Sequence, residues 1–346
     1  MKINKEFKTI HNSIQKEALV NEIKGNLFEY LVAHNCAKRL NVENTFLEHF
    51  SGDMKNMLMM YEKWLRSNDR ELIGKLQNLA LKTSVELSSH LQSILVSGEE
   101  IKTIVVIGKI TGAHHNDIFK EADILISTTS REIPISLKLS KKNAFVNTKS
   151  AGAKSFLAKY FDVFEEAQIF QSTYNDIIDK LFFELGEKLY ERRGLDFHGR
   201  FDSTWDGPDL PGELDELDRH DLYYMYQELS RNLYQTLLQF NELSTDLFSK
   251  ALLPLIGQGS DNLIQVTCFH QEKTIKGVKD KYEYSSVLIK DFVTSDKVVE
   301  FLPFKDSTSS FDIRLNEDIL QIRIKPMNKF TTASYKVNCS VRSNYE

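Results

Sequence analysis

The sequence predicts an α+β protein in which helices and strands occupy separate stretches of the chain. Through the first 100 residues, apolar side chains recur at steps of three and four, which is typical of amphipathic helices. Between residues 101 and 139 the segments become short, apolar and β-branched, and the helical period then returns until about residue 250. The last 85 residues consist of short alternating segments between polar turns, which indicates an antiparallel sheet.

Three helices are predicted before residue 100. Apolar positions at helical spacing run from residue 23 to 34 and again from residue 57 to 65. The third helix covers residues 70–95, and its leucines make one apolar stripe that indicates core packing. Gly98 ends this pattern.

Three strands are predicted next, at residues 101–107, 123–127 and 133–139. Because only residues 128–131 separate the second and third strands, these two should form a hairpin. From residue 150 helices are expected to about residue 250, interrupted by a loop at 201–212 that is rich in Gly, Pro and Asp.

Six short strands are predicted in the C-terminal part of the chain. The change of composition near residues 254–260 places the expected domain boundary there, giving domains of residues 1–256 and 257–346. The strands are expected at residues 263–269, 286–292, 298–304, 311–315, 319–324 and 335–341.

Composition and charge exclude several classes of protein. The chain of 346 residues is 41% hydrophobic and has no apolar run of transmembrane length, and its first residues lack the apolar core of a secretory signal, so a cytoplasmic protein is expected. Three widely spaced cysteines argue against a disulfide framework and a cysteine-built zinc site. The net charge of −5 conceals a basic stretch at residues 101–160, with 10 Lys and Arg against 4 Asp and Glu.

The residues with the clearest chemical meaning lie on the predicted hairpin. Alternation places Glu132, Pro134, Ser136 and Lys138 on one face of the third strand, and Asp123 begins the neighbouring strand. A carboxylate and an ammonium group in this arrangement suit metal-assisted hydrolysis of a phosphodiester. Asp123 would hold Mg²⁺ through oxygen, and Lys138 would steady the attacking water or the charge of the transition state. An ordinary strand lysine and a turn aspartate are the alternative.

The order of these elements resembles the PD-(D/E)xK nuclease superfamily of Type II restriction enzymes. Its members have a helix with a glutamate, a strand, a strand headed by aspartate, a strand with x-x-Lys and a further helix. Fifteen residues separate Asp123 from Lys138, which is within the family's range, and residues 25–30 resemble its first helix, with Glu29 in the position of the metal-binding acid. The similarity covers residues 25–40 and 100–165.

The resemblance implies a fold, a cofactor and a substrate. The fold would be a mixed-sheet nuclease core with large helical insertions. The C-terminal antiparallel β domain, predicted from periodicity, is not matched by the resemblance. Mg²⁺, which Mn²⁺ can replace, would be held by Asp123 and Glu29, and double-stranded DNA would be cleaved at a specific site. A palindromic site would require a homodimer.

Two positions depart from the family's pattern. Ala122 replaces the usual proline, and Ser136 stands where most members carry a second acid. A hydroxyl is a poor Mg²⁺ ligand, so another carboxylate is needed: Glu29 is the first candidate and Glu132 the second. Ser136 also favours an alternative function, a non-catalytic DNA-binding or assembly protein that keeps a degenerate nuclease fold. A structural protein without a nucleic-acid partner is a third possibility.

Basic and polar side chains outside the hairpin are candidates for contacts with DNA. Those after the third strand could follow a phosphate backbone, and those in the run 321–332 could read base edges, although a solvated loop or a lysine-protected sheet edge explains the same charges. His115, in the loop before Asp123, could touch phosphate; with His114 it leaves a zinc site as a lesser alternative. The candidates are Lys141, Lys142, Asn143, Lys149, His115, Arg323, Lys325, Asn328 and Lys329.

The acidic stretch 202–221 cannot lie on DNA. It is expected to be a solvent-facing loop and the start of a helix, with an autoinhibitory or DNA-mimicking segment as the alternative.

Overall fold

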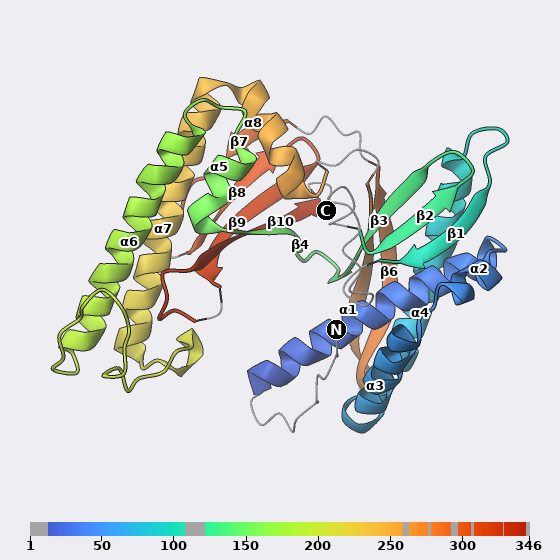
Figure 1. Ribbon diagram of the computed structural model, residues 1–346, viewed down its shortest axis with the longest axis horizontal. Coiled ribbons are helices and arrows are strands. Elements are labelled where there is room, and N and C mark those ends of the chain that lie inside the picture. Colours follow the sequence, from blue (N-terminus) through green and yellow to red (C-terminus); the bar gives the residue numbers. More distant parts are fainter. Residues whose placement is uncertain are drawn as a thin grey trace. The chain divides into compact units, whose positions relative to one another are not determined.

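The computed structural model describes residues 13–107, 122–258, 263–275, 278–291, 297–305, 308–327 and 329–343. The chain forms two compact units, each with its own five-stranded sheet (Figure 1). Unit 1 comprises residues 1–144 and 260–292, and unit 2 comprises residues 145–259 and 293–346. One sheet is mixed and the other antiparallel, so the predicted α+β class is confirmed at this level.

In the described part of unit 1, four helices precede the first strand, and their ends follow local sequence signals. The side chain of Ser51 accepts a hydrogen bond from the amide of Met54 and caps one helix, and Asp69 caps the next through the amide of Leu72. The predicted stripe of leucines in the third long helix is buried, as expected. The helices are α1 (Ser13–Arg39), α2 (Glu43–Glu48), α3 (Gly52–Asn68) and α4 (Arg70–Ile94).

The sheet of unit 1 has the strand order β1-β2-β3-β5-β6. The predicted hairpin is present, with β2 antiparallel to β3, whereas β5 runs parallel to β3. Pro134 is tolerated within β3 because the parallel ladder to β5 begins one residue later, at Ile135, so its missing N–H is not needed there. The strands are β1 (Ile101–Val106), β2 (Ile124–Thr128), β3 (Glu132–Lys141), β5 (Ile264–Ile275) and β6 (Val278–Lys290).

The two faces of this sheet differ in polarity. Helices α1 and α4 pack on the face that carries Ile133, Ile135 and Leu137, and these residues share one buried core. The opposite face carries a small apolar cluster that includes Leu125 and Leu263. Because side chains alternate along a strand, Ser136 and its neighbours in register also lie on this second face.

Unit 2 places helices on one face of an antiparallel sheet with the order β4-β10-β9-β8-β7 (Figure 1). Stacked rings of Phe161, Phe240 and Phe248 fill part of its core. The strands are β4 (Val146–Gly152), β7 (Val298–Phe301), β8 (Ser310–Leu315), β9 (Asp318–Pro326) and β10 (Tyr335–Ser343). The helices are α5 (Phe156–Tyr160), α6 (Ala167–Glu191), α7 (Glu216–Leu243) and α8 (Thr245–Leu252), with 3-10 turns at Ala153–Ser155, Pro211–Glu213 and Leu253–Ile256.

The structure divides the chain differently from the predicted boundary between residues 256 and 257. All six predicted C-terminal strands are present, but they do not form one domain. The first two, β5 and β6, complete the sheet of unit 1, and the other four join β4 in unit 2. Periodicity indicates that a segment is a strand, but it does not identify the partner strand, which explains this difference.

Strand β4 was not predicted; a loop and the start of a helix were expected there. The segment VNTKSAG is poor in β-formers, but β10 supplies its ladder partners from far along the chain. Thr148 anchors the strand: its hydroxyl donates to the carbonyl oxygens of Leu255 at 2.5 Å and Cys339 at 3.2 Å. Tertiary pairing therefore overrides local propensity here.

The acidic stretch 202–221 is only partly exposed to solvent, in contrast to the expectation. The Asp218 side chain is 1% exposed and accepts hydrogen bonds from Arg192 at 2.6 Å and Arg193 at 2.8 Å. Asp215 caps α7, and Asp209 binds Thr331 and Lys329. These acids serve as internal partners that hold the loop to the helices and strands of unit 2.

Among the described residues, no helix is long and apolar enough to cross a membrane. Cys36, Cys268 and Cys339 are buried free thiols, and burial raises the pKa of the Cys268 thiol to about 11.

Candidate active site

The β2–β3 hairpin brings together three of the predicted site residues: Asp123, Ser136 and Lys138. Asp123 directly precedes β2, and its amide donates to the carbonyl oxygen of Ile135 at 2.8 Å. Its carboxylate Oδ2 accepts from the amide of Leu137 at 2.7 Å and from the Ser136 hydroxyl at 3.4 Å. Lys138 Nζ lies 3.9 Å from the same oxygen.

The residues of the cluster differ in their exposure to solvent. The side chain of Lys138 is 31% exposed and that of Asp123 is 19% exposed, whereas Ser136 is buried. Charge is therefore concentrated in one carboxylate and one ammonium group that a ligand could reach. The buried serine hydroxyl holds the carboxylate in place and adds no charge of its own.

Gln265 extends this cluster on the next strand, and the sequence analysis missed it. It lies opposite Ser136 in the parallel register of β3 and β5, and its neighbours Ile264 and Val266 point into the core under α1 and α4. Gln265 therefore shares the face of Ser136. It is 6% exposed, and its Oε1 is buried without a hydrogen-bond partner. Glutamine in an alternating strand carries no motif, so only the register could identify it.

The oxygen atoms of this face fit a hard cation such as Mg²⁺. Mg²⁺ is bound in proteins through one or two carboxylates, with water and substrate phosphate completing its shell. Asp123 supplies one carboxylate, and the orphaned Gln265 Oε1 is a neutral oxygen donor on the same face. Among the residues that the structure describes, no three His, Cys, Asp or Glu side chains form a group that could hold a metal ion. The fit is thus to an open site with few protein ligands.

The two candidate substitutes for the missing acid occupy different places. Glu29 is half-buried in α1, which packs on the apolar face of the sheet, opposite the face of Ser136. Glu132 is exposed at the start of β3 and lies opposite Ser127. Asp123 is at the other end of the hairpin, since Ile124, the residue after it, lies opposite Ile135. The hairpin register shows no irregularity, so Glu132 is about 13 Å from Ser136 along the strand. The register therefore separates Glu132 from the cluster around Asp123, and the metal-binding roles of Glu29 and Glu132 stay predictions.

A different carboxylate, that of Glu99, holds the turn of the hairpin. Its Oε1 accepts from the hydroxyls of Thr128 at 2.6 Å and Ser130 at 2.7 Å, and from Arg131 Nε at 3.1 Å. The hydrogen bonds from Thr128 and Ser130 lower the pKa of Glu99 from 4.5 to about 2. This side chain is 1% exposed, so it is a structural acid that fixes the hairpin at the end remote from Asp123.

The basic residues after β3 are divided between the two units. Lys141, Lys142 and Asn143 are exposed at the end of β3 in unit 1, where Asn143 adopts a left-handed conformation with φ 61°. Lys149 belongs to β4 in unit 2, and its Nζ lies 6.0 Å from the centre of the Tyr160 ring. His115, with the rest of the loop at 112–117, lies outside the described residues.

The basic residues near the C-terminus lie on a sheet surface. Arg323 and Lys325 are exposed on β9, and Lys336 of β10 lies opposite Lys325 in the antiparallel register. Partial desolvation and the charges of Arg323 and Lys336 lower the pKa of Lys325. Lys329 forms an ion pair with Asp209, and Asn328 lies outside the described residues. We refer to Arg323, Lys325 and Lys336 as the basic sheet face.

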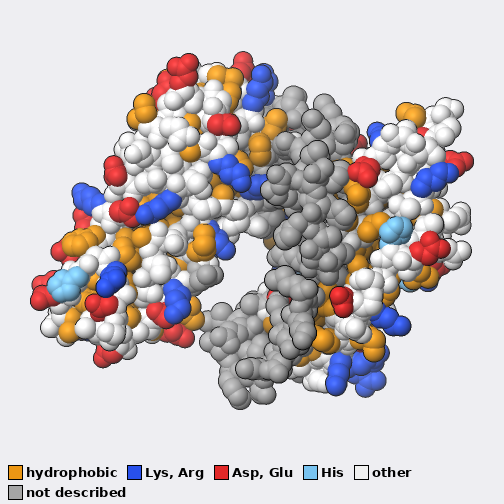
Figure 2. Space-filling view, viewed as in Figure 1, with side chains coloured by type: hydrophobic (Ala, Val, Ile, Leu, Met, Phe, Trp, Pro, Cys, Tyr) orange, Lys and Arg blue, Asp and Glu red, His pale blue; other side chains and the backbone are white. Residues whose placement is uncertain are grey.

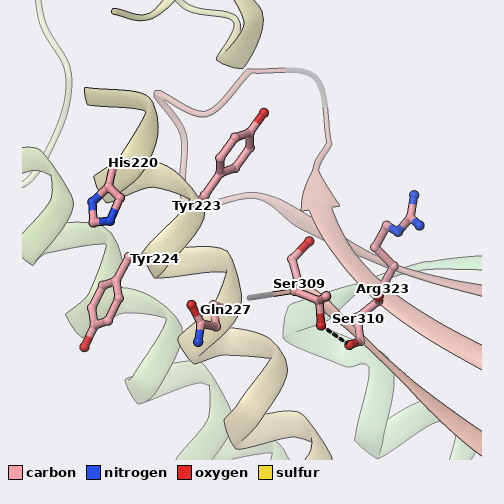
Figure 3. Close-up of a pocket in the computed structure, with 8 residues that line it drawn as sticks. His220, Tyr223, Tyr224, Gln227, Ser309, Ser310 and Arg323 are labelled. Carbon is pink, nitrogen blue, oxygen red and sulfur yellow. Dashed lines mark hydrogen bonds between the residues drawn. The ribbon is translucent and has the colours of Figure 1, made fainter. Parts of the chain in front are cut away.

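Arg323 also borders a hollow of 580 Å³ in unit 2 (Figure 3). One face of α7 contributes His220, Tyr223 and Tyr224, together with Gln227, and the start of β8 contributes hydroxyl groups. Both tyrosines are about half exposed. The residues described in the lining include no acid, whereas basic and acidic side chains are interspersed on the face shown in Figure 2.

Comparisons with known proteins do not assign the chain to a family. No protein-family model matches it, and no match was found among curated proteins or solved structures.

Proposed function

We propose that the protein is a Mg²⁺-dependent endonuclease that hydrolyses phosphodiester bonds in duplex DNA, as Type II restriction enzymes do. The observation that supports this most directly is the placement of Asp123 and Lys138 on adjacent strands, with 3.9 Å between Lys138 Nζ and Asp123 Oδ2. The order α1, β1, Asp-headed β2 and Lys-bearing β3 agrees with that of the PD-(D/E)xK enzymes. In place of the helix that follows the lysine strand in that family, the chain continues into β4 of unit 2.

The residues of the cluster can divide the work of hydrolysis. Asp123 would hold the cation, and the amide of Leu137 and the hydroxyl of Ser136 keep its carboxylate oriented. Lys138 would donate hydrogen bonds to the attacking water or to a phosphate oxygen, and its charge favours the transition state. A bound Mg²⁺ neutralises phosphate charge and lowers the pKa of water.

Affinity for DNA would come mainly from other basic side chains. Lys141 and Lys142 near the cluster and the basic sheet face in unit 2 could contact phosphates, which gives binding that is independent of sequence and sensitive to salt. The hollow beside Arg323 presents Tyr223 and Tyr224, whose rings could stack on bases. A palindromic recognition site would require a symmetric homodimer, and such an enzyme would act in the cytoplasm.

The proposal can be tested with the purified protein and a mixture of plasmid and phage DNA. Incubation with Mg²⁺ should give discrete fragments, whereas EDTA should prevent cleavage. Lys138→Ala should be inactive, and Lys102→Ala, a change of an exposed lysine on β1, is the matched control. A smear that is identical for wild type and Lys138→Ala would indicate a contaminating nuclease and contradict the proposal.

A second function is favoured by one observation. Ser136 occupies the position of the family's second acid, and Asp123, the one acid of the cluster that the structure describes, accepts hydrogen bonds from Leu137 and Ser136. A protein with this site could bind DNA without cutting it. Retarded migration of duplex DNA in a gel, with no cleavage in Mg²⁺ or Mn²⁺, would support this alternative.

A further inference from the structure

The unpaired side-chain oxygen of Gln265 lowers the stability of the folded protein, and its presence therefore requires an explanation. A buried carbonyl oxygen without a partner loses its hydrogen bond to water on folding and regains nothing. Gln265 Oε1 is in this state, on a residue that is 6% exposed in the parallel ladder between β3 and β5. A methionine of the same shape would avoid that cost. The amide is therefore suited to a ligand that binds to the folded protein.

The surroundings of Gln265 indicate the charge of that ligand. It lies opposite Ser136, whose hydroxyl donates to the carboxylate of Asp123. Asp123, Ser136 and Gln265 thus form a row across β2, β3 and β5 on one face of the sheet. A carbonyl oxygen on the same sheet face as a carboxylate favours a cation over an anion.

We propose that Gln265 Oε1 is a cation ligand that replaces, as a neutral oxygen from the next strand, the acid missing at Ser136. The inference rests on the proposed function, since it assigns a ligand of the same site. A site with one carboxylate and one amide oxygen has less negative charge than a site with two carboxylates. It should therefore bind divalent cations weakly until substrate phosphates contribute their own oxygens.

Direct measurement of Mn²⁺ binding to the full-length protein, by calorimetry and by the electron paramagnetic resonance of free Mn²⁺, tests the inference without DNA. Gln265→Met keeps the shape of the side chain and removes its oxygen, and should weaken Mn²⁺ binding at least about tenfold, the lower limit for losing even an outer-shell partner. Its melting temperature without metal should rise, because a buried unpaired acceptor is removed. Gln77→Met, on the exposed side of α4, should change neither quantity.

The variant Gln265→Glu shows whether the oxygen or the NH₂ group of the Gln265 amide faces the ligand. A side-chain amide can present an acceptor oxygen or a donor NH₂ group. If the oxygen faces the cation, the added carboxylate should tighten Mn²⁺ binding and make it depend on pH. Weaker binding in Gln265→Glu would contradict the inference, because it would mean that the NH₂ group faces the ligand.

The outcomes separate this inference from the proposed function. Mn²⁺ binding that is lost in Asp123→Asn but unchanged in Gln265→Met would overturn the role of Gln265 and leave the nuclease site intact. Absence of Mn²⁺ binding to the wild type at millimolar concentrations would also overturn the role of Gln265 as a cation ligand. DNA cleavage by wild type and Lys138→Ala, measured separately, decides the proposed function in either case.

Discussion

In each unit, helices cover one face of the sheet and the other face carries polar residues. These polar residues are buried in unit 1 and exposed in unit 2. In unit 1, Ser136, Gln265 and Thr267 are buried, and hydrogen bonds hold the carboxylate of Asp123 on the same face. In unit 2, Arg323 and Lys325 are exposed and face a third cation, Lys336. An enclosed row of polar atoms can bind one small group in a fixed geometry, whereas an exposed row of like charges attracts polyanions of any sequence.

The largest effect should come from ending the chain after residue 259. This truncation removes β5 and β6 and exposes the backbone of β3, so unit 1 should not fold. Hydrogen exchange of the amides of β1, β2 and β3 measures the loss. Protection of these amides at the level of the intact chain would show that the first three strands are stable alone and that β5 is dispensable.

Asp123→Ala and Lys138→Ala should each lower DNA cleavage by at least about 10²–10³-fold, the range for removing one group that stabilises a transition state. Both side chains are partly exposed, so DNA affinity should change little. Lys138→Ala should keep the melting temperature, whereas Asp123→Ala should lower it because the Leu137 amide loses its acceptor. Cleavage rates under single-turnover conditions provide the measurement. Retained activity in either variant would remove these residues from the site.

Neutralising the basic sheet face should weaken DNA binding without affecting the chemical step. For the triple change of Arg323, Lys325 and Lys336 to Gln, the negative slope of log K against log salt should become smaller in magnitude by about 3 if all three contact phosphates. A control of equal charge changes Lys154, Lys180 and Lys297 to Gln, since these lysines are paired with Asp or Glu. Equal slopes for both triple variants would contradict a specific role for this face.

Glu99→Gln should lower the stability of unit 1 and change its dependence on acid. Because the pKa of Glu99 is lowered from 4.5 to about 2, its contribution is complete above pH 4.5 and is lost as the pH falls towards 2. The wild type should therefore lose stability over this interval, and Glu99→Gln should lose less. Denaturant unfolding at pH 7, 4.5 and 3 measures both slopes; parallel curves would mean that Glu99 does not titrate with folding.

The smallest effect should be that of Glu132→Gln. Its carboxylate is exposed and distant from Asp123 along a regular hairpin, so the Mg²⁺ concentration needed for half-maximal cleavage should not change. Glu29→Gln should raise that concentration if α1 contributes a ligand when DNA is bound. A titration of Mg²⁺ with both variants decides between them. Inactivity of Glu132→Gln alone would require a different path for β3 in the active state.

Periodicity and spacing allowed most elements, but not their pairing, to be predicted. The hairpin is local: short strands and a four-residue connection specify it, and so the neighbouring positions of Asp123 and Lys138 could be predicted. The partners of β4 and β5 are distant in sequence, and nothing in a single strand encodes such a choice. For the same reason Gln265 could not be found, because its relation to Ser136 exists only through the parallel register.

The parallel pairing of β3 with β5 also determines the order in which the site can be completed during synthesis. A ribosome adds about 5–20 residues per second, so roughly 6–25 s pass between the emergence of Lys138 and that of Gln265. During that interval β3 is an edge strand of the nascent sheet, with Lys138 and Lys141 among the residues that will later pair with β5. Lysines on an edge discourage pairing with other chains, so Lys138 and Lys141 should also protect the unfinished protein from aggregation.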